Sequence, residues 1–262
     1  MKILLTNDDG INAPGLKVLE AIAARLTAPE NIWVVAPAFE QSGVGHCISY
    51  TRPLMMAEHG PRRVAVEGSP ADCVIAGLGA VMETRPDLIL SGVNRGNNSA
   101  ENTLYSGTLG AALEGALQRV PSIGLSQYYG PGNAREDHPF EAAEVHGADV
   151  IARILEAGFE EGADYGLFYN VNFPPVMAAD VKGTQVVRQG VRDGVFFGAV
   201  RDTSPNGRGF LWIKGGNQHV AVPDDTDAGA NMAGYVSVTP MRADLTAYGA
   251  MDKVAEAFAG DV

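Results

Sequence analysis

The segment that decides the fold reads KILLTNDDG, residues 2–10. Its first half, 2–6, is a short apolar run, which is typical of a fully buried strand. Its second half, 7–10, places two adjacent carboxylates, Asp8 and Asp9, directly after that strand. In α/β sheets, ligands bind outside the carboxyl ends of the strands. The segment therefore predicts a buried strand with a polar site at its end.

The rest of the first half of the chain alternates between strand and helix patterns. A helix is expected to begin at Ser69, because Pro70 follows it and Asp72 stands three residues after it, the signature of an N-terminal cap. We predict helices over 16–26, 70–82, 106–119 and 141–155, and strands over 32–36, 63–67, 87–90, 123–126 and 167–173. This alternation predicts an α/β fold with a doubly wound, mainly parallel sheet.

The pattern changes after about residue 175, where helical signals become rare. We predict strands over 184–187, 195–200, 209–213 and 235–239, and a helix over 251–258. We therefore expect one domain, 1–262, with a core over 1–175 and a β-rich extension over 176–262. Such an extension is the kind of arm that subunits exchange in oligomers.

The composition of the chain excludes several classes of function. The 262 residues carry a formal net charge of −12, which argues against long nucleic acid or an anionic membrane as a partner. No uncharged apolar stretch reaches the roughly 18 residues of a membrane helix, and residues 1–6 do not form a secretory signal. Cys47 and Cys73 lack metal-binding spacing. We expect a cytoplasmic protein with reduced thiols.

Three polar loops follow predicted strands, and oxygen-bearing side chains stand in each. Asp8 and Asp9 follow the first strand, Ser42 lies in the loop 37–51, and Asn94 lies in the predicted loop 91–105. Two adjacent carboxylates repel each other unless a cation lies near them, and hard divalent cations prefer oxygen ligands. The alternative interpretation is an Asp-Gly turn with a helix cap.

A second group of residues suits phosphate. Ser106, Gly107 and Thr108 open a predicted helix, and a helix N-terminus offers backbone N–H groups and a positive dipole end to anions. Asn98 can add an amide N–H and Arg95 a guanidinium. An ordinary N-cap, and a solvated Arg95, remain the alternatives. The dinucleotide and P-loop fingerprints and the nucleophile elbow of hydrolases are missing from the sequence.

Together these motifs resemble the SurE family of nucleotidases, in order and over nearly the whole chain. The matching segments are 1–11, 35–43, 68–74, 91–98, 105–108, 170–174 and 234–240. The resemblance implies a Rossmann-like core, a C-terminal extension that mediates a homodimer or homotetramer, and hydrolysis of nucleoside 5'- or 3'-monophosphates, with short polyphosphate as a further substrate. Segments 128–139 and 186–208 depart from the pattern, so they predict neither base preference nor oligomer size.

The resemblance also assigns residues. It implies a divalent cation, Mg²⁺ or Mn²⁺ first and Ca²⁺ as an alternative in a crystal. Its implied ligands are Asp8, Asp9, Ser42 and Asn94, and its implied phosphate contacts are Asn98, Ser106, Gly107 and Thr108. Asp8 and Asp9 are then the expected catalytic residues, acting on a water that the cation activates. A phosphate sensor without turnover and an oligomeric scaffold are the rival hypotheses.

Overall fold

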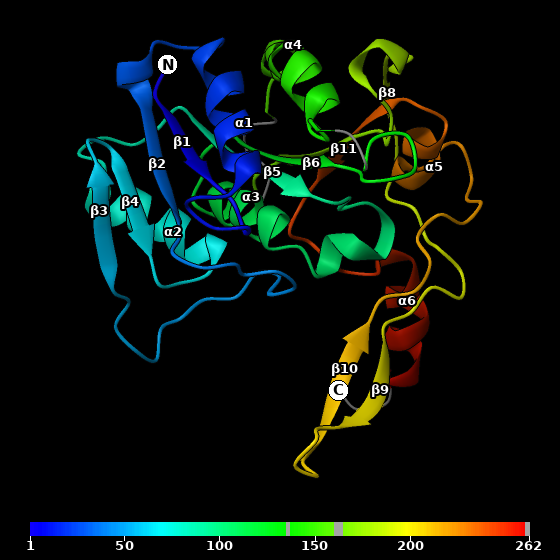
Figure 1. Ribbon diagram of the computed structural model, residues 1–262. Coiled ribbons are helices and arrows are strands. Elements are labelled where there is room, and N and C mark those ends of the chain that lie inside the picture. The colour runs from blue at the N-terminus through cyan, green and yellow to red at the C-terminus, as the bar shows by residue number, and fades with distance from the viewer. Residues whose placement is uncertain (135–136, 160–164, 260–262) are drawn as a thin grey trace.

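The computed structural model describes residues 1–134, 137–159 and 165–259. Nine strands form one sheet in the order β3-β4-β2-β1-β5-β6-β7-β11-β8, and two more form a separate hairpin (Figure 1). The strands are β1 (Ile3–Thr6), β2 (Ile32–Pro37), β3 (Met56–Gly60), β4 (Arg63–Val66), β5 (Leu88–Arg95), β6 (Ser122–Gln127), β7 (Phe168–Phe173), β8 (Thr184–Val186), β9 (Gly198–Thr203), β10 (Gly209–Lys214) and β11 (Val236–Met241). The helices are α1 (Pro14–Ala24), α2 (Pro70–Ala76), α3 (Gly107–Leu117), α4 (Glu141–Ala157), α5 (Asp227–Met232) and α6 (Tyr248–Ala257).

Strand β1 lies at the point where the strand order reverses. It pairs in parallel with β2 on one side and with β5 on the other. The chain proceeds outward from β1 to β2 and β4, then returns to β5 and continues to β6 and β7. Such a switch point opens a crevice at the carboxyl ends of the strands. The predicted doubly wound, mainly parallel sheet is confirmed.

Two layers of helices cover the sheet, with α1 and α4 on one face and α2 and α3 on the other (Figure 1). Successive side chains of a strand point to opposite faces. Ile3 and Leu5 accordingly join one buried cluster with Leu16 and Leu19 of α1, whereas Leu4 joins the cluster under α2. Burying each such side chain contributes roughly 1.5–3 kcal/mol, so β1 is fixed between the layers.

The helix predicted from Ser69 has the expected cap. Ser69 Oγ accepts from the Asp72 backbone N–H at 3.0 Å, and Asp72 Oδ2 accepts from the Ser69 N–H at 2.8 Å. The predicted extent, 70–82, was too long for an α-helix, because α2 ends at Ala76 and a π-helical turn, Gly77–Val81, follows. Gly77 packs so closely on Leu4 that a Cβ would lie 2.7 Å from it.

One loop prediction was wrong. Residues 91–95 were expected to begin a loop, but they complete strand β5, and Asn94 and Arg95 pair with β6. Ser91 and Val93 are fully buried, so ladder pairing and burial override a composition rich in turn residues. This strand extension carries Asn94 and Arg95 to the edge of the crevice.

Three elements were missed or displaced. Strand β3 is exposed along its whole length, so no apolar alternation announces it. Helix α5 is a six-residue element, too short for a helical period to show. Strand β9 begins at Gly198, three residues later than predicted, because its pairing with β10 begins only there.

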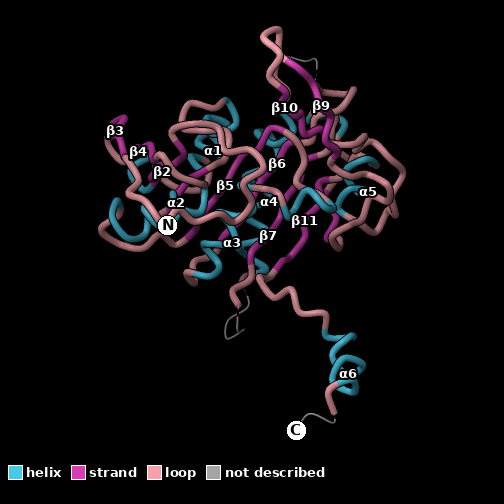
Figure 2. Tube along the Cα trace, turned by 90° about the horizontal axis from the view of Figure 1, so that it is seen from below, coloured by secondary structure: helices cyan, strands magenta, loops and turns pink. Residues whose placement is uncertain are grey.

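One part of the extension belongs to the central sheet, and another part extends away from it. Strand β11 pairs antiparallel with β7 and parallel with β8, so part of 176–262 belongs to the central sheet. Hairpin β9–β10 and helix α6 extend away from the body, in different directions (Figure 2), and every residue of the two hairpin strands is exposed. Among the described residues, no helix combines the length and apolar character needed to cross a bilayer.

Candidate functional site

The turn that carries the two carboxylates is set by its own side chains. Asn7 is fully buried and closes the turn with two bonds, from its Nδ2 to the Gly10 carbonyl at 2.9 Å and from the Gly10 N–H to its Oδ1 at 3.2 Å. Gly10 has a φ of +101°, which side-chain-bearing residues rarely adopt. The sequence Asn-Asp-Asp-Gly thus holds both carboxylates at the end of β1.

Asp8 is buried where β1 meets the start of α3. Its side chain accepts from the Thr108 hydroxyl at 2.7 Å and from the Thr108 backbone N–H at 3.3 Å. Burial raises the pKa of Asp8 to about 6, the negative charge of Asp9 adds to the rise, and the bonds from Thr108 oppose it. The ionised carboxylate is therefore disfavoured unless a positive group lies near it.

Asp9 lines a neighbouring cavity of about 410 Å³, which Arg95 also lines. Its Oδ2 accepts from the Arg95 backbone N–H at 3.2 Å. Burial raises the pKa of Asp9; the bond and the charge of Arg95 lower it, and the charge of Glu40 raises it. Two adjacent carboxylates thus both have raised pKa values, the electrostatic condition that a bound cation relieves.

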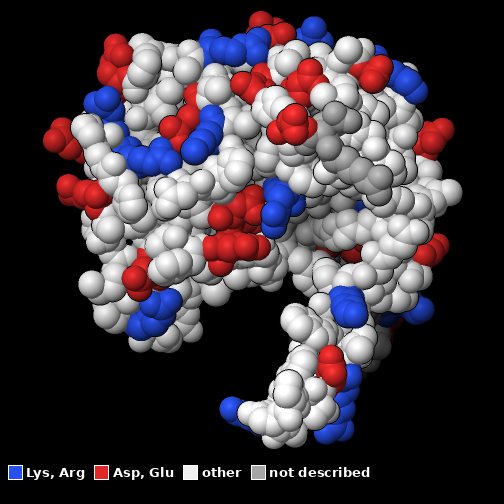
Figure 3. All heavy atoms as spheres, in the orientation of Figure 1, with Lys and Arg blue, Asp and Glu red and all other residues white. Residues whose placement is uncertain are grey.

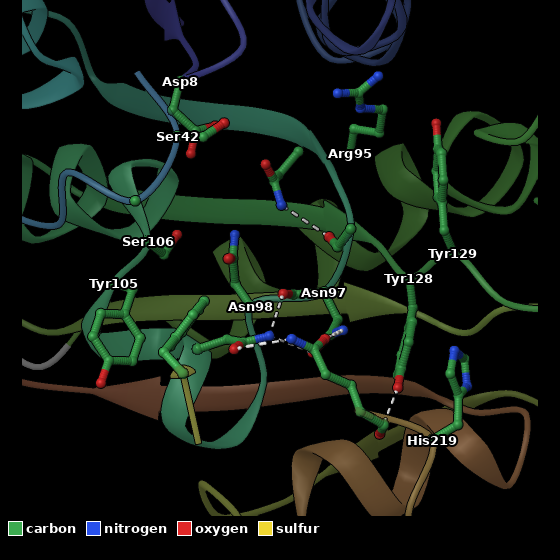
Figure 4. A pocket seen from close by; sticks show the side chains of 16 residues that line it. Asp8, Ser42, Arg95, Asn97, Asn98, Tyr105, Ser106, Tyr128, Tyr129 and His219 are labelled. Carbon is green, nitrogen blue, oxygen red and sulfur yellow. Dashed lines mark hydrogen bonds between the residues drawn. The ribbon is translucent and has the colours of Figure 1, made fainter. Parts of the chain in front are cut away.

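A cavity of about 340 Å³ brings most of the predicted site residues together (Figure 4). Six of them line it, namely Asp8, Ser42, Asn94, Arg95, Asn98 and Ser106. In Figure 4, Asp8, Ser42 and Ser106 gather on one side, and Tyr128 and His219 lie on the other. Figure 3 shows a hollow between the body and the hairpin, with charged side chains gathered on the body above it.

Three predicted residues do not line this cavity. Asp9 faces the neighbouring cavity. The Thr108 hydroxyl, predicted as a phosphate contact, instead donates to Asp8 and is fully buried. Gly107 allows the close approach of α3 to the β1 loop, because a Cβ there would lie 2.9 Å from the Asp8 Cβ and 3.1 Å from Pro70 Cγ. Both residues therefore position Asp8 against the helix start.

Asn98 is held by a buried network of amides. Its backbone N–H donates to Asn172 Oδ1 at 2.7 Å, its carbonyl accepts from Asn170 Nδ2 at 2.9 Å, and its own Nδ2 donates to Ser126 Oγ at 2.8 Å. Asn172 Nδ2 donates in turn to Asn170 Oδ1. Two neighbouring strands, β6 and β7, thus fix the residue on the cavity wall.

The donor set suits a hard divalent cation. Asp8 offers carboxylate oxygens, Asn94 keeps its amide oxygen because its Nδ2 donates to the Gly96 carbonyl at 2.9 Å, and the Ser42 hydroxyl donates to Glu40 at 2.8 Å. No group of three or more His, Cys, Asp or Glu side chains within the described ranges forms a metal site. Neutral oxygens must therefore complete any coordination around the Asp8–Asp9 pair, as Mg²⁺, Mn²⁺ and Ca²⁺ accept.

Other residues on the cavity carried no prediction. Tyr128 and Tyr129 follow β6, so the rule that sites lie at carboxyl ends of strands could have indicated them. Phe197, Gln218 and His219 come from the extension, and no local pattern marks residues that reach a site through long-range packing.

The comparisons with known proteins agree with this geometry. The family model described as "Survival protein SurE" matches residues 3–194. A protein of Jannaschia sp. named "5'-nucleotidase SurE" is 65% identical over 98% of this chain and 99% of its own length. One of the same name from Roseobacter denitrificans is 62% identical over 97% of this chain and 98% of its own length.

A solved structure extends the likeness to three dimensions. The SurE protein of Aquifex aeolicus superposes with a TM-score of 0.78 at 36% identity, covering 97% of this chain and 98% of that chain. The family resemblance of the motifs is confirmed over both the core and the extension. With its carboxylate pair at the switch point and full-length relatives of one name, the chain belongs to the SurE family.

Proposed function

We propose that this protein hydrolyses nucleoside 5'-monophosphates, and 3'-monophosphates as second substrates, to nucleoside and phosphate with the help of a divalent cation. The observation that carries the proposal is the meeting of a buried carboxylate, Asp8, with the N-terminus of α3 in one cavity. One group suits a cation and the other suits a phosphate. Relatives of 60–65% identity bear the name of this activity.

Asp8, Asp9, Ser42 and Asn94 would hold the cation, which when bound supplies positive charge to the phosphoryl oxygens and lowers the pKa of a water. The chain's own residues supply the remaining functions. Ser106 and the first turn of α3 stabilise charge that grows on the phosphoryl group, since helix N-termini present N–H groups to anions.

Asn98 and Asp8 orient the reacting groups. The Asn98 side chain lines the cavity and donates to Ser126 Oγ, and from there it would contact the phosphate. Asp8 Oδ2, whose bond from the Thr108 N–H is long at 3.3 Å, takes the proton of the attacking water.

The experiment is phosphate release from purified protein with a panel of 5'- and 3'-nucleoside monophosphates and tripolyphosphate, in EDTA or with Mg²⁺, Mn²⁺ or Ca²⁺. We expect release from the nucleotides that requires cation and stops in EDTA, with slower release from tripolyphosphate. Folded protein that binds nucleotide in EDTA yet releases no phosphate with any cation would instead indicate a phosphate sensor.

We also propose that the protein is a homodimer or homotetramer joined through its extension. Hairpin β9–β10 exposes large apolar side chains, among them Leu211, Trp212 and Ile213, and α6 exposes Met251 and Val254. Contiguous exposed apolar surface favours association between proteins. A second copy is the proposed partner because both elements extend beyond the body, as exchanged arms do.

A further inference from the structure

The cavity of Asp8 also reaches two aromatic side chains, Tyr105 and Phe197. Their ring centroids lie 5.0 Å apart with an interplanar angle of 75°. Such an edge-to-face pair leaves ring faces uncovered. The two residues are 48% and 49% exposed, so a flat ring entering the cavity can stack on them.

The other polar groups near this aromatic pair already bind one another. Asn97 Nδ2 donates to Gln218 Oε1 at 2.8 Å, and Gln218 Nε2 donates to Asn102 Oδ1 at 3.3 Å. The Tyr128 hydroxyl donates to the Gln218 carbonyl at 3.0 Å, and the His219 ring lies against the Tyr128 ring at 5.3 Å. Among the described residues, Tyr105 and Phe197 have no such polar partners, and they form an exposed aromatic surface of the cavity.

Phe197 is held at the cavity although it comes from the extension. Arg192, five residues earlier, has a fully buried side chain whose guanidinium donates to Asn97 Oδ1 at 2.7 Å and to the Ser99 carbonyl at 3.1 Å. Asp227 accepts from the backbone N–H groups of Ala100 and Gly190 at 3.0 and 2.9 Å. The segment that presents Phe197 is thus fastened to the loop that carries Asn98.

We infer that the nucleobase of the substrate stacks on the Tyr105–Phe197 pair, so that the extension supplies a specificity-determining residue. This inference rests on the proposed function for the phosphate end of the cavity. Tyr105 directly precedes Ser106, the first residue of the proposed phosphate site at the start of α3, which we call the phosphate cradle (residues 106–108). The base and the phosphate would therefore bind to adjacent residues of the chain. Bases of every kind present a face for stacking, which makes an aromatic pair a suitable platform.

The test measures equilibrium binding of adenosine 5'-monophosphate and of ribose 5-phosphate, which lacks the base, to the wild type and to Phe197→Ala. Loss of one stacking partner should weaken nucleotide binding roughly ten-fold and leave ribose 5-phosphate binding unchanged. In turnover assays the same variant should raise KM for the nucleotide, with kcat/KM for ribose 5-phosphate unaltered.

Two further variants keep the result interpretable. Phe197→Tyr should restore nucleotide binding, because the aromatic face returns. Phe196→Ala removes a neighbouring ring that is 77% exposed and does not line the cavity, and it should bind like the wild type. Equal losses for both ligands in Phe197→Ala, or no loss for either, would overturn the inference. Binding without any turnover would overturn the proposed function alone.

Discussion

Asp8 combines deep burial, a neighbouring carboxylate and a raised pKa, all of which oppose its negative charge in the folded protein. Evolution commonly tolerates such destabilised groups where function needs them. Thr108 supplies two bonds to the carboxylate, which fixes its orientation without neutralising it. The residue is therefore arranged for a cation and for proton transfer at the expense of stability.

The first prediction is that Asp8→Asn lowers turnover at least 10²- to 10³-fold, the usual effect of losing a preorganised group in a transition state. In EDTA the same variant should melt at a higher temperature than the wild type, because a neutral amide removes the buried charge. Mn²⁺ should raise the melting temperature of the wild type, since a ligand stabilises the state that binds it, and leave Asp8→Asn unchanged. Near-wild-type turnover of the variant would contradict the roles of Asp8 as cation ligand and as proton acceptor.

For single residues, the sequence predicted which side chains lie together at the site but not what each of them contacts. Asp8 and Ser42 follow strands β1 and β2 and Asn94 lies at the end of β5, so parallel topology alone brings the three together. The N-cap pattern at Ser106 could not show that the Thr108 hydroxyl turns back to Asp8, because the partner lies a hundred residues earlier in the chain. Side-chain direction at a helix start depends on the tertiary neighbour.

Helix α3 connects the phosphate cradle to the loop that carries Ser42. Gly110 lies so close to this loop that a Cβ would stand 2.4 Å from the Gly45 carbonyl oxygen. One turn further, the nearly buried Glu114 side chain lies 2.7 Å from His46 Nε2 and accepts from Gln118 Nε2 at 2.9 Å.

The second prediction concerns Glu114→Gln. The bond with His46 is the main cause of the lowered pKa of Glu114, and burial opposes it. A lowered carboxyl pKa contributes stability that is complete above the ordinary value of 4.5 and is lost as pH falls through the lowered value. Urea unfolding should show the variant about 1–3 kcal/mol less stable at pH 7, and the difference should shrink below pH 4.5. A difference that stays constant over this range would refute the argument.

The third prediction compares two arginines of one segment. Arg192→Met removes a buried guanidinium from Glu101, Ser99 and Asn97, and breaking a buried pair typically costs about 3–5 kcal/mol. Arg188→Met removes an exposed pair with Asp225, worth less than about 1 kcal/mol. Denaturant unfolding should therefore separate the two, and only Arg192→Met should also weaken nucleotide binding. Equal effects would show that the extension is not fastened through Arg192.

Elements were predictable where local pattern and tertiary burial agree. Strand β1 and helix α1 show clear apolar periods, and the cap at Ser69 is visible in three residues. The end of β5 was mispredicted because Ser91, Gly92 and Asn94 are typical of loops, whereas Ser91 pairs with β1 and β6 and Asn94 pairs with β6. Strand β3 was not predicted from the sequence, because an exposed edge strand needs no apolar face and so shows no apolar alternation.

At the scale of the whole molecule, the hairpin and α6 are the parts that a single chain does not bury. The fourth prediction is that the protein sediments as a multiple of its 27.5 kDa chain mass. The double variant Leu211→Glu with Ile213→Glu, which charges one side of β10, should sediment as a monomer. Asn206→Glu, in the hairpin turn, is the matched control and should retain the wild-type mass. A monomeric wild type would refute association through the extension.

The family and the sheet architecture followed from motifs in the right order, while the shape of the cavity did not. Three residues of the cavity lining, Phe197, Gln218 and His219, come from the extension, where the surrounding sequence resembles any exposed loop. Their placement depends on buried contacts made by Arg192 and Asp227 across the molecule. Such contacts depend on the complete fold, and they produce no periodic pattern in the local sequence.

The late position of β11 has a consequence for synthesis. This strand, residues 236–241, lies between β7 and β8 in the sheet, so β8 cannot take its place until the ribosome has released almost the entire chain. A nascent chain that ends after β7 already contains Asp8 and the start of α3, yet it lacks Arg192, Phe197 and Asp227. Since domains fold as units during translation, catalytic competence should appear only at the last stage of elongation, and prematurely terminated chains should be inactive.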